Sequence, residues 1–188
     1  RLWDVSASRC VRVFAGHAGS VTAVRLSRDG QYALSASRDR TLRVWDVKGQ
    51  ECVSVLRAHE GPVLSVDASA DFSAAASYGQ DGRLLFWNLL KGSVARSEEE
   101  IDGGDSGAVA MARDGSVALA GGRDGTIRVI SLNAGGPEGV LEGHTAPVRC
   151  LSISAKGRYA LSGSEDRTIR LWSLDPLRLV RTLHGNTD

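Results

Sequence analysis

The chain has 188 residues, of which 23 are Lys or Arg and 22 are Asp or Glu, so its formal net charge is only +1. This balance provides no overall field that would attract nucleic acid or an anionic membrane, and no apolar run reaches the roughly 20 residues that span a bilayer. The three cysteines are too few for a disulfide framework, which favours a reducing, cytoplasmic location.

Regularly spaced residues divide the chain into repeats. The first three tryptophans, Trp3, Trp45 and Trp87, are 42 residues apart, and Trp172 follows after about two more such intervals. The same frame aligns one column of aspartates and one of histidines: Asp39, Asp81, Asp124 and Asp166, and His17, His59 and His144. A fixed period of this size indicates a propeller or solenoid, in which each repeat buries its faces against its neighbours.

In chain order, the repeats are predicted to be a partial unit at 1–14, four full units at about 15–56, 57–98, 99–141 and 142–183, and the start of another at 184–188. Within 15–56, β-branched runs at 21–26, 32–35, 41–46 and 52–56 are separated by turn residues such as Asp29-Gly30. Four short strands per repeat predict one four-stranded antiparallel blade. Because the chain starts in a third strand and ends inside a new repeat, we expect it to be part of a longer array.

The repeated residues also resemble a known family. Gly16-His17, Asp39 and Trp45-Asp46, with Gly143-His144 and Trp172 later, are similar to the marks of the WD-repeat β-propeller family. The resemblance covers essentially the whole chain, although the later dipeptides are Trp87-Asn88, Ile130-Ser131 and Trp172-Ser173, and Ala58 replaces a glycine. It implies an all-β fold, a β-propeller with about four full blades and a half blade in this stretch.

A serine joins the aligned His, Asp and Trp in three repeats. The sets are His17, Ser35, Asp39 and Trp45; His59, Ser77, Asp81 and Trp87; and His144, Ser162, Asp166 and Trp172. A Ser-His-Asp combination can indicate a hydrolase, but an enzyme needs one accessible nucleophile, not three copies in register. The resemblance implies instead a buried structural chain of hydrogen bonds from Trp through Ser and His to Asp. We therefore predict no catalytic residue, no metal site and no cofactor.

The repeat at 99–141 has lost most of this set. It has Asp102, Ala120 and Ile130 in the His, Ser and Trp columns and keeps only Asp124. Loss of three members together is expected of a connected network, because a partial network leaves polar groups buried without partners. We expect this blade to be the least stable of the four.

The resemblance also indicates where a partner would bind. In the family, the residue before the turn aspartate points to the face where partners commonly dock, and the residues at that position here are Arg38, Gln80, Arg123 and Glu165. Simple exposure would explain their variety equally well. Arg38 and Arg123 are the favoured contact residues, because arginine is common among residues that dominate binding energy.

Two features depart from the repeat. The acidic run Glu98–Glu100, with Asp102 and Asp105, is either a solvated loop or a rim for a basic partner. Tyr78 stands where the other repeats have Ala36, Gly121 and Gly163, and either fills space between blades near Ile130 or serves recognition.

These features together predict a non-catalytic scaffold for protein–protein interaction, part of a longer propeller, with protein or peptide partners and no nucleic acid or membrane. Open blade faces at the two ends are expected to favour self-association. The alternative is a regulatory or sensor domain of a larger enzyme or signalling protein. A propeller hydrolase would need an unpaired titratable group or metal cluster near its axis, and the sequence shows none at ligand spacing.

Overall fold

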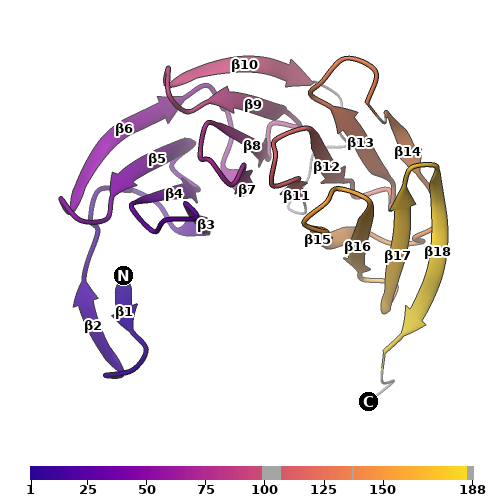
Figure 1. Ribbon diagram of the computed structural model, residues 1–188, viewed down its shortest axis with the longest axis horizontal. Helices are drawn as coiled ribbons and strands as arrows, with labels where there is room; N and C mark the ends of the chain where they lie inside the picture. The colour runs from indigo at the N-terminus through magenta and orange to yellow at the C-terminus, as the bar shows by residue number, and fades with distance from the viewer. Residues whose placement is uncertain (99–106, 137, 186–188) are drawn as a thin grey trace.

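A computed structural model describes residues 1–98, 107–136 and 138–185, and these residues form strands, turns and connections without any helix. The strands make one two-stranded and four four-stranded sheets, all antiparallel, arranged along an arc (Figure 1). The predicted all-β fold with four-stranded propeller blades is confirmed. Asp102 and most of the acidic run lie outside the described residues.

Each four-stranded sheet pairs its strands in chain order. The first sheet contains β1 (Leu2–Asp4) and β2 (Arg9–Arg12). The second contains β3 (Val21–Leu26), β4 (Tyr32–Ser37), β5 (Thr41–Asp46) and β6 (Glu51–Arg57). The third contains β7 (Val63–Ala68), β8 (Ala74–Gly79), β9 (Leu84–Asn88) and β10 (Ser93–Glu98). The fourth contains β11 (Ala108–Met111), β12 (Val117–Gly121), β13 (Ile127–Ser131) and β14 (Gly139–Leu141). The fifth contains β15 (Val148–Ile153), β16 (Tyr159–Ser164), β17 (Thr168–Leu174) and β18 (Leu177–His184).

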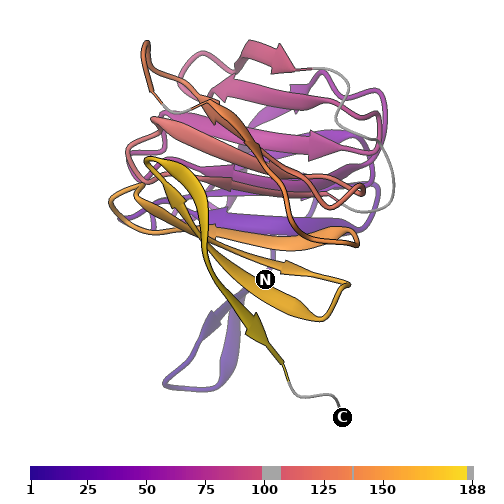
Figure 2. The ribbon, with the colours of Figure 1, turned by 90° about the vertical axis from the view of Figure 1, so that its right-hand side faces the viewer.

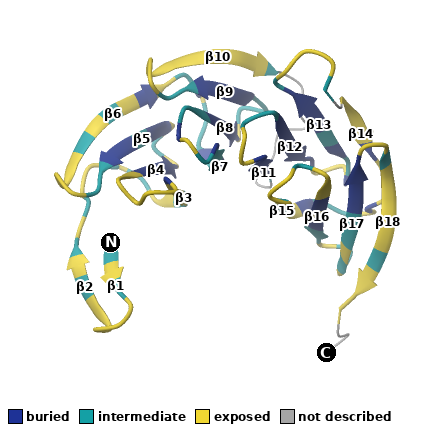
Figure 3. Cartoon of the chain, in the orientation of Figure 1, coloured by how far each residue is buried: buried dark blue, intermediate teal, exposed yellow. Residues whose placement is uncertain are grey.

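The first strand of each full sheet lies on the inner side of the arc and the last strand on the outer side (Figure 1). The inner strands are linked by polar contacts: the Thr22 hydroxyl donates to the Val63 carbonyl over 2.8 Å, and the Val109 amide donates to the Ser65 hydroxyl over 3.3 Å. A view at right angles shows the sheets lying face to face, with the β1–β2 hairpin at one end (Figure 2). The middle strands are the most buried and the outer strands the most exposed (Figure 3).

The hydrophobic core lies between neighbouring sheets, in three clusters. Leu34, Val44 and Trp87 belong to the cluster of the second and third sheets, and Leu119 and Trp172 to that of the fourth and fifth. The cluster between the third and fourth sheets contains Tyr78, which is fully buried, together with Ile130. Tyr78 therefore packs in the space between these sheets, within the cluster that contains the residue replacing the missing tryptophan.

A bulge accompanies every tryptophan. The pairing of the outermost two strands shifts by one residue beside Trp3, Trp45, Trp87 and Trp172. In the fourth sheet, whose third strand has Ile130 in this column, the described pairings of β13 with β14 run from Ile127 to Val129 and do not include Ile130. A bulge bends and twists a strand locally and re-aims a side chain.

The second and fifth sheets, which are the first and last of the four-stranded sheets, expose apolar side chains. Val21, Val24 and Leu26 of β3 are 51%, 51% and 58% exposed, and Leu161 and Ile169 of the fifth sheet are 43% and 47% exposed. The expected self-association through these surfaces stays a prediction.

Candidate functional site

The second sheet holds a chain of four hydrogen-bonded side chains. The Trp45 indole N–H donates to the Ser35 hydroxyl oxygen over 2.8 Å, and Ser35 lies 2.7 Å from Nε2 of His17. Nδ1 of His17 is 2.8 Å from the Asp39 carboxylate. Indole can only donate, so the serine hydroxyl is left to donate to Nε2, and the histidine proton sits on Nδ1, facing Asp39.

The third and fifth sheets repeat this geometry. The Trp–Ser distances are 2.8 Å in both, and the His–Ser distances are 2.7 Å in both. The shortest His–Asp distances are 3.0 Å for His59 and 2.6 Å for His144. The histidine and serine of both sheets are buried, so each polar atom depends on its partner in the chain.

The aspartates also hold the turn that follows. Asp39 accepts hydrogen bonds from the Thr41 hydroxyl at 2.7 Å and from the amides of Thr41 and Ala18 at 3.0 Å each. Burial alone would raise the pKa of Asp39, but the hydrogen bonds from Thr41, His17 and Ala18 outweigh it and hold the pKa far below its usual range. Asp166 has the same pKa direction from the corresponding donors, Thr168, His144 and Thr145.

For His59, burial has the larger effect on the pKa. Burial lowers the pKa of His59 below its usual value because it disfavours the imidazolium form, and this outweighs the attraction of Asp81. A neutral ring is the form that can accept from Ser77 while donating to Asp81.

The serines are poorly suited to nucleophilic attack. Ser35, Ser77 and Ser162 are 4%, 0% and 1% exposed, and each hydroxyl oxygen already accepts an indole hydrogen bond. A catalytic serine must reach a substrate carbonyl next to an oxyanion hole. The geometry therefore favours the structural interpretation of the three sets, which stays a prediction until the residues are varied.

The fourth sheet replaces the network with apolar contacts. Ala120 and Ile130 are 0% and 7% exposed, and both pack in the cluster that contains Tyr78. Within the described residues, the Asp124 carboxylate accepts hydrogen bonds only inside its own turn, from the Thr126 amide at 2.9 Å and the Thr126 hydroxyl at 2.7 Å.

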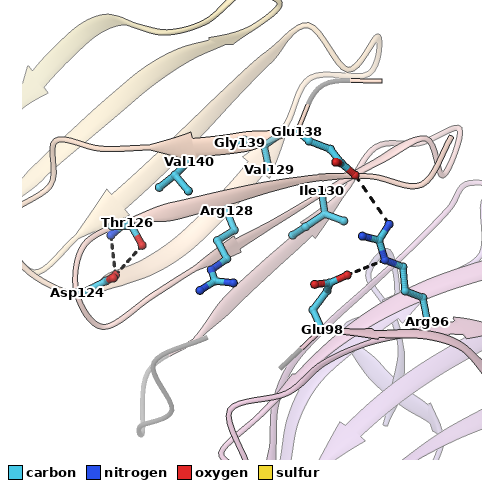
Figure 4. Close-up of a pocket in the computed structure, with 10 residues that line it drawn as sticks. All are labelled: Arg96, Glu98, Asp124, Thr126, Arg128, Val129, Ile130, Glu138, Gly139 and Val140. Carbon is cyan, nitrogen blue, oxygen red and sulfur yellow. Dashed lines mark hydrogen bonds and ion pairs between the residues drawn. The ribbon is translucent and has the colours of Figure 1, made fainter. Parts of the chain in front are cut away.

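A groove of about 400 Å³ runs beside Ile130 between the third and fourth sheets (Figure 4). Arg96 projects into it from β10, with Nε 2.7 Å from Glu98 and a terminal nitrogen 3.9 Å from Glu138. These charges are therefore paired with one another across the groove. Arg128 also lines it, two residues before Ile130, as Arg43 and Arg170 precede their tryptophans.

We define the loop face as the face that holds the connections between sheets and the turns between second and third strands. The four predicted partner-binding residues all lie on these turns and are exposed: Arg38, Gln80, Arg123 and Glu165. Backbone amides of three of them donate to the connecting loops: Arg38 to Ser20, Gln80 to Pro62 and Glu165 to Pro147, at 2.9, 2.8 and 3.1 Å.

The four side chains differ in their contacts. Glu165 accepts a hydrogen bond from Nε of Arg149 over 2.8 Å, so its charge is paired. Arg38 and Arg123 form no side-chain hydrogen bond or ion pair within the described residues. These two guanidinium groups are therefore available to a ligand.

Two further arginines on the loop face were missed by the sequence analysis. Arg40 and Arg167 follow the turn aspartates and adopt left-handed backbone conformations, with φ of 69° and 66°. The corresponding positions in the third and fourth sheets are Gly82 and Gly125, with φ of 74° and 84°. Glycine is favoured in this region, so Asp-Arg in place of Asp-Gly was the signal that would have identified them.

Within the described ranges there is no cluster of three or more His, Cys, Asp or Glu residues able to hold a metal ion. No helix capable of crossing a lipid bilayer occurs in that part of the chain.

Comparison with known proteins relates the chain to a repeat family. The family described as "WD domain, G-beta repeat" matches four times, at residues 8–46, 50–88, 102–131 and 135–173. Among curated proteins, Autophagy-related protein 16 of Arabidopsis thaliana is 28% identical over 158 residues, which cover 84% of this chain and 23% of the relative. The chain thus spans about a quarter of the length of that relative.

Proposed function

Because the chain belongs to the WD40 repeat family, we propose that it is a non-catalytic scaffold that binds a protein or peptide partner at its loop face. Family membership establishes the kind of fold, and the site itself must support the function. The WD40 repeats favour protein–protein interaction in general, and the exposed loop-face residues support the loop face as its location.

The observation that supports this proposal is the set of unpaired arginines on the loop face. Arg38 and Arg123 are exposed and without side-chain partners in the described part of the chain, and so are Arg40 and Arg167. The turns that bear them are stabilised from within by Asp39, Asp124 and Asp166. A rigid backbone with free guanidinium groups favours binding because little ordering is needed when a ligand docks.

The absence of catalysis is also part of the proposal. The three Ser-His-Asp sets are used internally, with their serine oxygens buried and hydrogen-bonded. A recognition domain within a larger enzyme or signalling protein is the second candidate, and the coverage of only 23% of the Arabidopsis relative favours it. We also propose a cytoplasmic location, which the three free cysteines support.

The test compares two faces of the molecule with the same change of charge. Proteins captured by the wild-type chain from lysate of its source would be identified, purified and titrated individually. The double variant Arg38→Glu/Arg123→Glu should weaken binding of a true partner at least about tenfold, or about 1.4 kcal/mol. The matched control is Arg9→Glu/Arg181→Glu, which changes two exposed arginines on outer strands.

Retained affinity in the loop-face variant, with loss in the control, would place the interaction on the outer rim and contradict the proposal. Both variants should keep the urea midpoint of the wild type, because all four side chains are exposed. An enzymatic activity that depended on Ser35, Ser77 or Ser162 in the folded protein would contradict the non-catalytic assignment.

A further inference from the structure

A second hollow lies at the face opposite the loop face, where the inner strands end. The turns between first and second strands define this turn face: residues 27–31, 69–73, 112–116 and 154–158. The hollow has a volume of about 500 Å³ and is lined by the ends of β3, β7, β11 and β15 with their turns. It therefore involves the inner strands of all four full sheets, which Figure 1 shows on the concave side of the arc.

One carboxylate in the hollow is already satisfied. Asp67 accepts from Nε of Arg25 over 2.7 Å with one oxygen and from the Met111 amide over 2.9 Å with the other. This single side chain joins the second, third and fourth sheets, and its charge is balanced by Arg25. Because both Asp67 oxygens already accept these hydrogen bonds, Asp67 competes only weakly with a ligand for the other arginines of the hollow.

Two further arginines lie at equivalent positions of two turns, one after β3 and one after β11. Arg28 follows β3 and Arg113 follows β11, and both are exposed, line the hollow and have no side-chain hydrogen bond or ion pair among the described residues. The intervening turn has Ala70 at the same position, and the Ala70 amide donates to the Arg113 carbonyl over 2.7 Å. Ala70 also lines the hollow and contributes only a methyl group there.

The neighbouring turn aspartates are used locally. Asp29 accepts from the Ser27 hydroxyl at 2.6 Å and Asp114 from the Ser116 hydroxyl at 2.6 Å. Asp71 accepts from the Ser69 hydroxyl at 2.6 Å. The oxygens of these carboxylates are bonded within their own turns rather than to Arg28 or Arg113.

The hollow combines cations with apolar surface. Its lining includes three guanidinium groups, one carboxylate, the exposed Leu26 and the half-buried Leu151 and Ile153. Guanidinium groups recognise carboxylates through paired hydrogen bonds, whereas exposed leucine and isoleucine side chains offer nothing to a small inorganic anion. A peptide that alternates acidic and apolar side chains can bind the guanidinium groups and also contact the apolar side chains.

We propose that this hollow on the turn face binds an acidic peptide segment, with Arg28 and Arg113 holding its carboxylates and Leu26, Leu151 and Ile153 contacting its apolar side chains. The site is separate from the loop face and does not depend on the function proposed there. A chain with both sites holds two partners on opposite faces.

The experiment uses two labelled probes, a hexapeptide of alternating glutamate and leucine and its lysine–leucine counterpart, followed by fluorescence anisotropy at low ionic strength. The acidic probe should bind and the basic probe should not. Arg28→Gln/Arg113→Gln should weaken binding of the acidic probe at least about tenfold. Added salt should weaken the wild-type complex, because the contacts are partly exposed charges.

The matched control is Arg9→Gln/Arg181→Gln, which removes the same number of exposed arginines from the outer strands β2 and β18. Its affinity for the acidic probe should stay within about twofold of wild type. Equal weakening by both double variants would show that the probe responds to total charge only and would overturn the proposal.

A third arm separates a peptide from a small anion. Inorganic phosphate and free glutamate should displace the probe only at concentrations that also act through ionic strength, as sodium chloride does. Displacement by phosphate well below that concentration would assign the hollow to small anions and overturn the peptide assignment. Unchanged urea midpoints of both variants would show that any loss of binding is not caused by unfolding.

Discussion

The fourth and fifth sheets solve the same packing problem in different ways. In the fifth, Trp172, Ser162, His144 and Asp166 form a continuous polar chain, and a bulge lies beside the tryptophan. In the fourth, Ala120 and Ile130 pack against other apolar residues, and the described pairings are regular throughout. The outer strand is also different, because β18 has eight residues and β14 only three.

The tryptophan and the bulge occur together, and in the second, third and fifth sheets the polar network accompanies them. The four positions with a tryptophan have a shift of register beside it, whereas the described pairings of β13 with β14 end at Val129, one residue before Ile130. A bulge inserts one extra residue into a strand and turns the neighbouring side chains. We infer that in these three sheets it helps to aim the indole N–H toward the serine.

The largest expected effect is loss of a network aspartate. Asp39→Ala removes the partner of His17 and of the Ala18 and Thr41 amides and should lower the free energy of unfolding by about 2–4 kcal/mol. Asp124→Ala, the matched change in the fourth sheet, removes only bonds to Thr126 and should cost about 1 kcal/mol or less. Urea denaturation of the two variants measures the difference. Equal losses, or altered partner binding by Asp39→Ala at unchanged stability, would contradict the structural role.

Hydrogen exchange should show the next largest difference. The fourth sheet lacks the network, and β14 pairs with β13 through three residues only. Its amides between 107 and 141 should exchange about tenfold faster than those of the other full sheets, equivalent to about 1.4 kcal/mol in opening free energy. Burial opposes this expectation, because β11 and β12 are buried along their whole length. Equal or greater protection in the fourth sheet would show that burial by its neighbours outweighs the missing network.

The smallest expected effect is a pH dependence that only network sheets can provide. Burial lowers the pKa of His59 in the folded state, so below about 6.5 the unfolded chain binds a proton that the folded chain does not. The free energy of unfolding should therefore decrease as the pH falls from 7 to 5, by at most about 1.4 kcal/mol per pH unit for this group. Urea midpoints at several pH values test this, and an NMR titration of His59 above pH 6.5 would contradict it.

The network aspartates affect the free energy of unfolding at lower pH than His59 does. The pKa values of Asp39 and Asp166 are depressed in the folded state, so their contribution is present above the ordinary value of 3.8 and is lost as the pH falls below it. The two ranges are separate, which allows the histidine and aspartate contributions to be distinguished in one series of measurements.

The repeat made much of the fold and part of the site predictable. The tryptophan and aspartate columns located the strands and turns because a side chain that repeats at a fixed interval occupies the same place in every blade. Other features were missed for identifiable reasons. Arg40 and Arg167 were overlooked because their column varies between Arg and Gly. Asp67 is a single residue outside the shared pattern, and its contacts with Arg25 and Met111 link three sheets.

The sequence by itself determined the all-β repeat, the number of strands in each unit and the residues that accompany each tryptophan, since these depend on short segments of chain with local periodicity and turn residues. Only the tertiary structure decided the bulges, the placement of Tyr78 beside the fourth sheet, the contact of Arg25 with Asp67, and the presence of Arg28 and Arg113 in the same hollow. The contacts between sheets join residues about one or two repeats apart, and they depend on how neighbouring sheets twist and stack rather than on any local pattern.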